Sequence, residues 1–394
     1  MLYKIVFPTI LTFLLLLNAC SSNTTSDNTQ VFTLQEKIFV HNLFLSEYLW
    51  YDQVASNLDY ALFNAPQTLI NELRISPPDK WSFTLTEQAY EDFSNQKTVG
   101  FGFGHTQDFS IFLVRINAPA YKKLYRGDKI LFINGQSVTQ DIITTVSQNT
   151  GVATTFTVLR NSNQLDIVIT PVPYTFKVSL GKLIDQNTTK IGYLRYDSFT
   201  ESSISELETI FTTFKTANIS ELIIDLRYNG GGSIITASTL LDNISNAYAG
   251  ERQIYLDWNA NYKTKNETYT FEDIDLQDGN ELTMQRVVFL VTEKSASASE
   301  LVISALKPYL GNTNVITVGS NTHGKPVGMS GRTYGINYYF LANFLVRNNS
   351  NNTTSFDGIS PTCRAEDDLT HAMGDTNETM LSTALYYVQN DTCP

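Results

Sequence analysis

The chain of 394 residues is long enough for two or three domains with a sizeable hydrophobic core. Its apolar fraction of 42% and charged fraction of 17% are ordinary for a globular protein. The formal net charge of −12 argues against nucleic acid or an anionic surface as the main partner. The 4 histidines are scattered and form no Cys/His cluster, so the sequence predicts no metal site, and we expect no cofactor.

Residues 1–20 have the features of an export signal. A positive residue near the start is followed by an apolar core, Ile10 to Leu17, which is too short to span a membrane comfortably. The segment ends in Leu17-Asn18-Ala19-Cys20, which resembles a bacterial lipobox. The resemblance implies that Cys20 is lipidated and becomes the first residue of the mature chain. Ordinary signal-peptide cleavage is the alternative, because asparagine is less usual within such a motif.

Lipidation at Cys20 would place the protein in the bacterial cell envelope. We expect a membrane-anchored lipoprotein that faces the periplasm or the outside of the cell. Residues 21–31 are rich in Ser, Thr and Asn and are predicted to form a flexible tether. The other two cysteines, Cys363 and Cys393, are a natural disulfide pair in an exported protein. Their bond would fasten the C-terminal tail to the body of the protein.

The segment 32–85 is predicted to be helical. Apolar residues recur at helical spacing from Leu34 to Tyr51, and aromatic residues widen the apolar face. A second helix is expected from Pro66 to Leu73. We interpret the aromatic face as a packing surface and assign no ligand site to it.

The region 86–175 shows β-type runs and turn signals. Gly100-Phe101-Gly102-Phe103-Gly104 precedes an apolar run at 110–116. Asn134-Gly135 lies between β-prone flanks and predicts a tight turn. A glycine-rich loop alone usually marks turns. Combined with the stretch Arg126-Gly127-Asp128-Lys129-Ile130, however, the pattern resembles a PDZ domain.

A PDZ domain binds a peptide by adding it as a strand to the edge of a sheet. The resemblance implies that backbone N–H groups of the loop Gly100, Phe101, Gly102 and Phe103 would bind the C-terminal carboxylate of a peptide. The helix that lies between the two parts of the pattern is expected at Pro119 to Leu124. Bulky residues there replace a plainer small-residue pattern.

From about residue 176 onward, predicted strands alternate with predicted helices, which favours an α/β layer arrangement. Apolar, β-branched runs identify the strands, and apolar residues at helical spacing identify the helices. The expected strands are 191–196, 222–226, 287–291, 315–318 and 338–346, and the expected helices are 203–217, one from about 234, one from about 299, and 380–388.

Polar or glycine-rich loops follow three of these strands, at 227–232, 294–299 and 320–328. The ends of parallel strands converge on a ligand crevice in α/β folds, so we expect the three loops to meet. Each loop has a simpler explanation when taken alone. A glycine run makes a tight turn, and most lysines are exposed.

The loop 294–299 contains three serines at a strand-to-helix turn. Such a turn raises a side chain above the sheet edge and directs free backbone N–H groups at an approaching ligand. A nucleophilic serine needs this exposure together with a base and a pocket that stabilises an anion. The alternative is that the serines are ordinary helix-capping residues.

Three segments together resemble the signatures of the C-terminal processing peptidases, the tail-specific serine peptidases of family S41. They are Asp225-Leu226-Arg227-Tyr228-Asn229-Gly230-Gly231-Gly232, Ser295-Ala296-Ser297-Ala298-Ser299-Glu300 and Gly324-Lys325. Ile191-Gly192-Tyr193 and Asp357-Gly358-Ile359-Ser360-Pro361 also fit that family. The resemblance implies a multi-domain α/β protein with a helical N-terminal segment (32–85), a PDZ-like β domain (86–175) and a peptidase core (176–394) of the crotonase-like ClpP/S41 type.

The resemblance also assigns roles to residues. Ser297 would be the nucleophile and Lys325 the base, which requires that burial lower the pKa of the lysine. The backbone N–H groups of Ala298 and of Gly231 or Gly232 would hold the oxyanion. A peptide bond would then be hydrolysed through an acyl-enzyme. Substrates would be proteins or peptides, engaged through apolar C-termini.

Two positions depart from the family pattern or compete with it. Many members carry a glutamine four residues after the lysine, where this chain has Met329. His323, two residues before Lys325, offers an alternative base. Met329 therefore keeps open a second reading, in which the chain is a catalytically silent relative that binds peptides through its PDZ-like domain. A non-proteolytic hydrolase with the same Ser-Lys dyad is a third and weaker hypothesis. Ser295 and Ser299 are interpreted as turn and cap residues.

Overall fold

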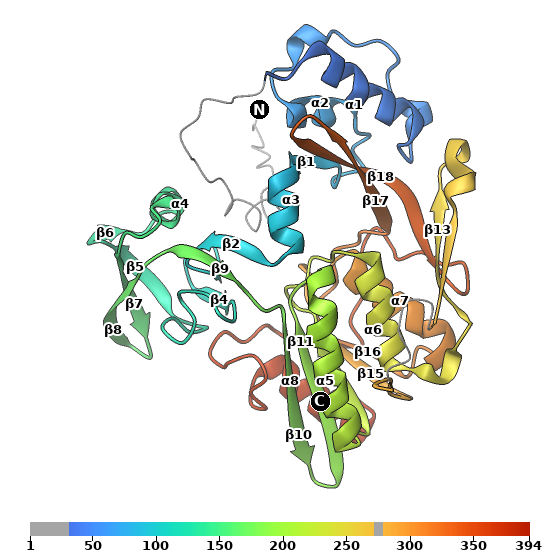
Figure 1. Cartoon of the computed structure of the whole chain (residues 1–394). Coiled ribbons are helices and arrows are strands. Elements are labelled where there is room, and N and C mark those ends of the chain that lie inside the picture. Colours follow the sequence, from blue (N-terminus) through green and yellow to red (C-terminus); the bar gives the residue numbers. More distant parts are fainter. Residues whose placement is uncertain (1–30, 272–278) are drawn as a thin grey trace, which may run out of the picture. The chain divides into compact units, whose positions relative to one another are not determined.

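The computed structural model describes residues 31–271 and 279–394 (Figure 1). The predicted export signal with Cys20, and the tether up to residue 30, lie outside the described residues. The described chain forms two compact units. One is Glu91–Phe176, and the other combines Lys177–Pro394 with the N-terminal segment that ends at Tyr90. Across the described residues, no helix has both the length and the apolar character that crossing a membrane would require.

The larger unit is built on a six-stranded sheet in the order β10-β11-β12-β15-β16-β19. The strand β10 is antiparallel to β11, and the other neighbours are parallel. The carboxyl ends of β11, β12, β15 and β16 therefore lie at the same edge of the sheet. The strands are β10 (Ser179–Gln186), β11 (Thr189–Tyr196), β12 (Glu221–Asp225), β15 (Val287–Val291), β16 (Val315–Gly319) and β19 (Cys363–Arg364).

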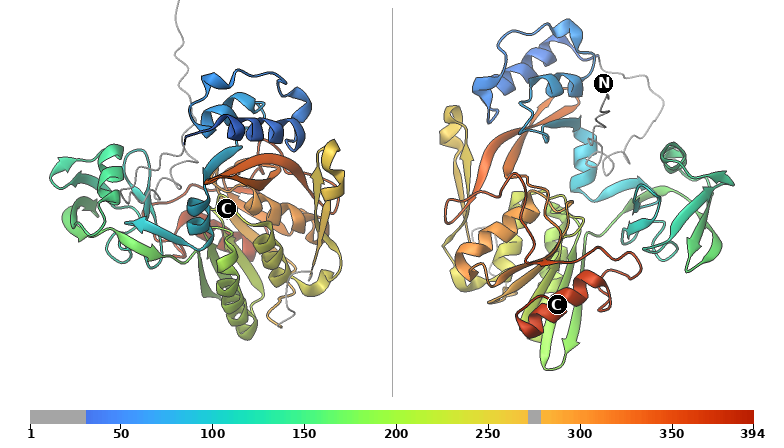
Figure 2. Two further views of the ribbon diagram at one scale, coloured as in Figure 1. Left: turned by 45° about the horizontal axis from the view of Figure 1, so that its top comes forward. Right: turned by 180° about the vertical axis from the view of Figure 1, so that it is seen from behind.

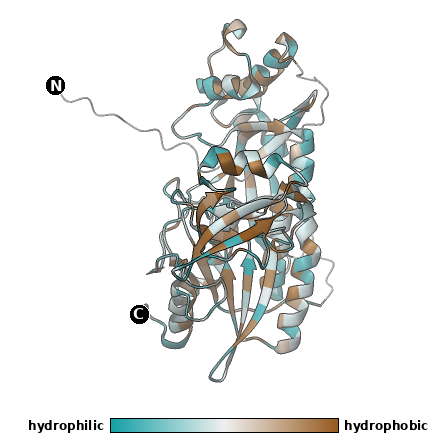
Figure 3. Ribbon diagram, turned by 90° about the vertical axis from the view of Figure 1, so that its left-hand side faces the viewer, coloured by the Kyte–Doolittle hydropathy of each residue, from teal (hydrophilic) through white to brown (hydrophobic). Residues whose placement is uncertain are grey.

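Helices cover both faces of this sheet, which explains the uninterrupted apolar runs of its strands. All residues of β15 and β16 are buried, as expected for a parallel sheet between two helical layers. The helices α5 (Ile204–Ala217), α6 (Ile234–Ile244) and α7 (Ala298–Leu310) pack on one face (Figure 1). The opposite face carries α8 (Thr379–Asn390), seen from behind in Figure 2. Figure 3 shows the hydropathy pattern, with long apolar stretches along the strands and mixed colours on the helices.

A second, antiparallel sheet of the same unit has the order β1-β18-β13-β14, and β17 also pairs with β18. The short helix between β13 and β14 is of the 3₁₀ type. The strands are β1 (Phe83–Thr86), β13 (Arg252–Trp258), β14 (Glu267–Thr270), β17 (Val327–Tyr334) and β18 (Asn337–Asn348), and the 3₁₀ helices of the unit are Tyr51–Gln53, Tyr60–Leu62, Glu201–Ser203, Asn246–Tyr248 and Ala260–Lys265.

The helical N-terminal segment packs on this second sheet. Its helices α1 (Leu34–Ser46) and α2 (Pro66–Leu73) share one hydrophobic core with residues of β17 and β18. Two buried glutamates add polar contacts. Glu36 accepts hydrogen bonds from Tyr339 (2.6 Å) and Asn337 (2.8 Å). Glu47 forms a bidentate ion pair with Arg332. The predicted helical segment is therefore confirmed, and it belongs to the same unit as the core.

The helix α3 (Glu87–Ser94) leads the chain into the smaller unit, which is mostly β structure. The strands β6, β5, β7 and β8 form an antiparallel sheet in that order, while β2 pairs with β9 and β3 with β4. Ten buried apolar residues, among them Phe101 and Phe156, form its core. The elements are β2 (Lys97–Gly100), β3 (Phe103–His105), β4 (Ile111–Val114), β5 (Lys129–Ile133), β6 (Gln136–Ser137), α4 (Gln140–Gln148), β7 (Thr154–Arg160), β8 (Asn163–Ile169) and β9 (Val172–Thr175).

Two local predictions in this unit have different outcomes. Asn134-Gly135 forms the tight turn between β5 and β6, and both residues have the positive φ that such a turn needs, 50° and 77°. The helix expected at Pro119 to Leu124 is wrong, because this stretch consists of consecutive turns. Lys122 within it has a φ of 62°, which a right-handed helix does not allow.

Candidate active site

Ser297 lies on a strained turn between β15 and α7. Its φ of 57° and ψ of −113° are unusual for a residue with a side chain. Such a conformation costs on the order of 1–3 kcal/mol, so the surrounding structure must enforce it. Strained strand-to-helix turns of this kind present a nucleophilic serine at the top of a sheet in other hydrolases. Ser297 is only partly buried, whereas Ser295 and Ser299 are fully buried.

The other two serines fasten the turn to the glycine-rich loop that follows β12. The hydroxyl of Ser295 donates a hydrogen bond to the carbonyl of Leu226 (2.7 Å). The hydroxyl of Ser299 donates to the carbonyl of Asn229 (2.9 Å). Their hydroxyls therefore serve as structural donors, and Ser297 is left as the candidate nucleophile.

Gly231 packs directly against this turn. A Cβ atom built on Gly231 would come within 2.8 Å of the Ser297 Cβ and 3.1 Å of the Ala298 nitrogen. With a φ of 104°, this position requires glycine for both reasons. Its carbonyl accepts a hydrogen bond from the Phe199 N–H (3.0 Å), and a Cβ on Gly232 would overlap the Phe199 carbonyl at 2.1 Å. Gly231 thus lies directly beside Ser297 and Ala298, and Gly232 lies against Phe199.

The backbone N–H of Gly231 already has an acceptor. It donates to the side-chain oxygen of Asn229 (2.9 Å). The side-chain nitrogen of Asn229 in turn donates to the Tyr196 carbonyl (2.9 Å), so this asparagine braces the loop against the end of β11. Of the two predicted glycine donors, Gly232 is therefore the better candidate for a role toward an oxyanion.

Lys325 lies in the loop between β16 and β17 and is 9% exposed. Burial lowers the pKa of its ammonium group from 10.5 to about 8, and the negative charges of Asp79 and Glu300 oppose that shift. Its Nζ atom lies 3.2 Å from the Sδ atom of Met329. A thioether sulfur is a weak acceptor, so it stabilises the ammonium less than an amide oxygen would. Met329 therefore contacts the candidate base while leaving its pKa low.

Glu300 joins the serine turn to the lysine loop. Its Oε2 atom accepts hydrogen bonds from the backbone N–H of Ser297 (3.0 Å) and of Lys325 (2.8 Å). Its Oε1 atom accepts from the N–H of Gly324 (2.8 Å) and the hydroxyl of Thr322 (2.5 Å). The side chain is fully buried. Sequence reasoning assigned no role to this residue, although the Ser-x-x-Glu spacing of a capping box was visible.

His323, the alternative base, contacts the part of the serine turn that precedes Ser297. The backbone N–H of His323 donates to the Ser295 carbonyl (2.9 Å). Its ring nitrogen Nδ1 lies 3.3 Å from the carbonyl oxygen of Glu293, four residues before Ser297. Burial, with the positive charges of Lys80 and Lys325, lowers the pKa of His323.

The segment around Asp357-Gly358-Ile359 clamps the lysine loop from outside. The N–H of Ile359 donates to the Thr322 hydroxyl (2.7 Å), and the N–H of Thr322 donates to the Ile359 carbonyl (3.1 Å). A Cβ on Gly324 would lie 2.2 Å from the Phe356 carbonyl. The loop therefore has little freedom to move, which fits a lysine that must keep its position.

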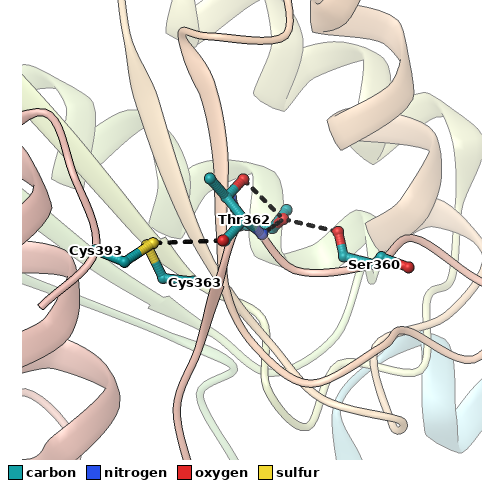
Figure 4. The surroundings of a disulfide bond; sticks show 5 residues. Ser360, Thr362, Cys363 and Cys393 are labelled. Carbon is teal, nitrogen blue, oxygen red and sulfur yellow. Dashed lines mark hydrogen bonds between the residues drawn. A yellow bond between two sulfur atoms is a disulfide. The ribbon is translucent and has the colours of Figure 1, made fainter.

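The disulfide between Cys363 and Cys393 lies just after this segment in the chain (Figure 4). Cys363 begins β19, directly after Thr362, whose N–H donates to the Thr317 hydroxyl (3.0 Å) of β16. Cys393 lies close to the C-terminus, with its sulfur 3.4 Å from the Thr362 carbonyl oxygen. The two cysteines that the sequence suggested as a pair are thus bonded, and the bond ties the C-terminal tail to the sheet.

A buried ionic network supports the glycine loop from below. Arg227 is fully buried and pairs with Asp225 (2.9 Å), Glu378 (2.9 Å) and Asp367 (2.9 Å). Glu378 also caps α8, because its carboxylate accepts the N–H groups of Met380 and Leu381. The network therefore connects Arg227, three residues before the glycine run, to the C-terminal helix.

Removing Glu378 should destabilise the protein strongly. Breaking a buried ion pair by deleting one partner typically costs about 3–5 kcal/mol, because it leaves the other charge unpaired. We expect Glu378→Ala to lower the free energy of unfolding by about that amount, measured by urea denaturation. Glu366→Ala is the matched control, since Glu366 is exposed and should change stability by less than about 0.5 kcal/mol. Equal stabilities of the two variants would contradict this interpretation of the network.

The residues predicted to bind a peptide lie in the smaller unit. Phe101 is buried in its core, 3% exposed, with its ring against Phe156. The carbonyls of Phe101 and Gly102 accept hydrogen bonds from Ala120 (2.9 Å) and Arg115 (2.8 Å). Gly100 ends β2 and Phe103 begins β3. In both units, among the described residues, no three His, Cys, Asp or Glu side chains are grouped so that they could hold a metal ion.

Comparison with known proteins places this geometry in a family. The family model "Peptidase family S41" matches residues 190–365, and the model "Peptidase S41 N-terminal domain" matches residues 36–83. Together these two matches cover more than half of the chain. They include the serine turn, the glycine loop and the lysine loop, as well as the N-terminal helices.

Curated relatives share part of the sequence. Carboxyl-terminal-processing peptidase 1 of Arabidopsis thaliana chloroplasts is 27% identical over 248 residues, which are 59% of this chain and 46% of the relative. Carboxyl-terminal-processing peptidase 3 of the same plant is 30% identical over 143 residues, 36% of this chain and 25% of the relative. The matched region thus spans a quarter to just under half of the length of these relatives.

Solved structures share the fold. A candidate S41 protease from Bacteroides fragilis superposes with a TM-score of 0.78 at 23% identity, over 90% of this chain and 97% of that one. The photosystem II D1 C-terminal processing protease superposes with a TM-score of 0.52 at 15% identity, over 84% and 92% of the two chains. With the two family matches and this agreement in architecture, the chain belongs to peptidase family S41.

Proposed function

We propose that the protein is a serine endopeptidase that hydrolyses peptide bonds of protein substrates with a Ser-Lys dyad. Ser297 attacks the scissile carbonyl, and the neutral amine of Lys325 accepts its proton and later passes it to the leaving amine. The N–H groups of Ala298 and of Gly232, the better candidate of the two glycines, stabilise the oxyanion. Water then hydrolyses the acyl-enzyme.

The observation that carries the proposal is the Glu300 carboxylate, whose Oε2 atom accepts the N–H groups of both Ser297 and Lys325. This shared acceptor brings the strained serine and the buried lysine into one rigid assembly. The lysine pKa of about 8 supports the role of base, because a general base works best when its pKa is near the operating pH.

The proposal extends to location and recognition. The lipobox-like sequence at Cys20 supports a lipid anchor in the bacterial cell envelope, with the enzyme on the periplasmic or extracellular face. The glycine-rich loop Gly100–Phe103 supports a PDZ-like role for the smaller unit, in which apolar peptide C-termini dock on its β structure. Neither a metal nor a cofactor takes part in this chemistry.

Cleavage of an unfolded protein tests the proposed function. Wild-type protein should degrade it, and Ser297→Ala or Lys325→Ala should lower kcat by about 10⁴-fold or more, as removal of a nucleophile or base does in other serine hydrolases. Ser304→Ala and Lys307→Ala are matched controls on α7, and Lys307 also has a pKa lowered by burial. Both controls should keep near-wild-type rates.

Two results would change the assignment. If wild-type protein binds C-terminal peptides but cleaves no unfolded protein, the chain is the silent peptide-binding relative instead. If Lys325→Ala remains active while His323→Ala does not, the base is His323.

A further inference from the structure

The loop Asp79–Ser82 of the N-terminal segment contacts residues that lie next to both ends of the lysine loop. At one end, the Ser82 hydroxyl accepts the N–H of Ala342 (3.1 Å), and Ala342 pairs with Met329 across β17 and β18. Met329 in turn contacts the amine of Lys325. Three consecutive contacts therefore connect Ser82 to the candidate base.

At the other end, Trp81 packs against Phe356, with ring centroids 5.9 Å apart. The Phe356 carbonyl is the group that lies against Gly324, directly before Lys325. Trp81 also shares a hydrophobic core with Val327, which directly follows the lysine loop. The N-terminal segment thus braces the base from two directions.

Asp79 is the charged centre of this loop. Its carboxylate is fully buried and accepts four hydrogen bonds, all from neutral donors. The donors are the N–H groups of Trp81 (2.8 Å) and Ser82 (3.0 Å) and the hydroxyls of Tyr48 (2.8 Å) and Ser82 (2.6 Å). A buried carboxylate surrounded by neutral groups is costly unless a positive charge lies within electrostatic reach.

We propose that Asp79 is a positioning residue for the base, held by Tyr48 and Ser82, which gives the buried Lys325 its counter-charge from the N-terminal segment. This proposal rests on the proposed function, in which Lys325 is the base. It gives the N-terminal segment a part in the chemistry as well as in folding.

The electrostatics of the site agree with this role. Burial lowers the pKa of Lys325, and Asp79 is the first of the two negative groups that raise it, followed by Glu300 of α7. His323 is the other titratable group of the same loop, and its own pKa is lowered in part by Lys325. A lysine with too low a pKa would be a weak base, so Asp79 keeps its proton affinity near the working pH.

The pH dependence of kcat/KM tests the proposal. Asp79→Asn removes the charge with little change in shape. The acid limb of the profile should therefore shift to lower pH by about half a unit to one unit, as expected for loss of one partly screened charge. Tyr48→Phe is the matched control, because it removes one donor from the same carboxylate and keeps the charge. Its acid limb should stay at the wild-type position even if stability falls.

The outcomes separate the two proposals. A wild-type protein that cleaves nothing contradicts the proposed function itself. An active wild type together with a folded Asp79→Asn variant whose acid limb is unshifted overturns the role of Asp79. If Asp79→Asn does not fold, Ser82→Ala keeps the charge but removes the link to β18. It should then lower kcat with little change in KM, and an unchanged kcat would overturn the positioning role.

Discussion

Glu300→Ala should lower kcat/KM for an unfolded protein by about 1000-fold. Two of the four hydrogen bonds to this carboxylate fix the backbone of the nucleophile and of the base. Bonds to a buried charged acceptor contribute about 1.5–3 kcal/mol each, and two of them account for a rate factor of that size. Without the acceptor, the strained φ of Ser297 would relax and the backbone of the lysine loop would shift away from the serine. Steady-state kinetics on folded protein, verified by circular dichroism, measures the effect.

Two further variants separate position from charge. Glu293→Ala removes an exposed glutamate from the start of the same turn and should keep near-wild-type activity. Glu300→Gln retains one acceptor oxygen and places an NH₂ group against two donors, so its activity should fall between wild type and Glu300→Ala. If Glu300→Ala cleaves as fast as Glu293→Ala, the carboxylate does not organise the site.

The α/β core could be predicted closely from the sequence because its elements have strong local signals. The continuous apolar run at Val287–Val291 is a strand with those bounds, and Pro66–Leu73 is a helix with those bounds. Strands of the second sheet were missed where their pairing is distant. β13 carries mixed polar and apolar residues and is stabilised by β18, about ninety positions later, so no local pattern reveals it.

In the candidate site too, short local motifs could be predicted from the sequence, whereas contacts between distant segments could not. Ser297, Lys325 and the glycine run are identified by short motifs that each occupy one loop. The contact between the Lys325 amine and the Met329 sulfur depends on the path of the chain at the start of β17, so the spacing of four residues could not establish it. Asp79 has no sequence signal at all, because it belongs to a separate segment that meets the lysine only through tertiary packing.

Activity should rise with pH through about 8 because the base must be neutral. Below its pKa, the fraction of Lys325 in the amine form falls tenfold per pH unit. At pH 6 the value of kcat/KM should therefore be about 100-fold below its alkaline plateau. A profile recorded on one peptide substrate from pH 6 to pH 10 measures this limb. A limb centred below about 6.5 would indicate a histidine base, because the pKa of His323 is lowered from its ordinary value, and would contradict the role of Lys325.

The same lysine should cost the protein stability at neutral pH. A pKa lowered from 10.5 to about 8 corresponds to about 3 kcal/mol of unfavourable free energy whenever the ammonium form is buried. Between pH 8 and 10.5 the unfolded chain binds more protons at this residue than the folded one. Stability therefore rises with pH across that window, and the penalty is fully present only below about pH 8.

Lys325→Met should consequently be inactive but more stable. The substitution keeps an unbranched side chain and removes the buried charge, so the free energy of unfolding at pH 7 should increase by about 1–3 kcal/mol. Urea denaturation at pH 7 and pH 10 measures the difference, which should shrink at the higher pH because wild-type Lys325 is then mostly neutral in the folded state. Lys307→Met, at a partly buried lysine whose pKa is also lowered, should show a smaller effect of the same sign. A Lys325→Met protein that is less stable than wild type at pH 7 would mean that the lysine side chain stabilises the fold by packing. A gain in stability together with loss of activity would show that the fold carries this buried cation for catalysis.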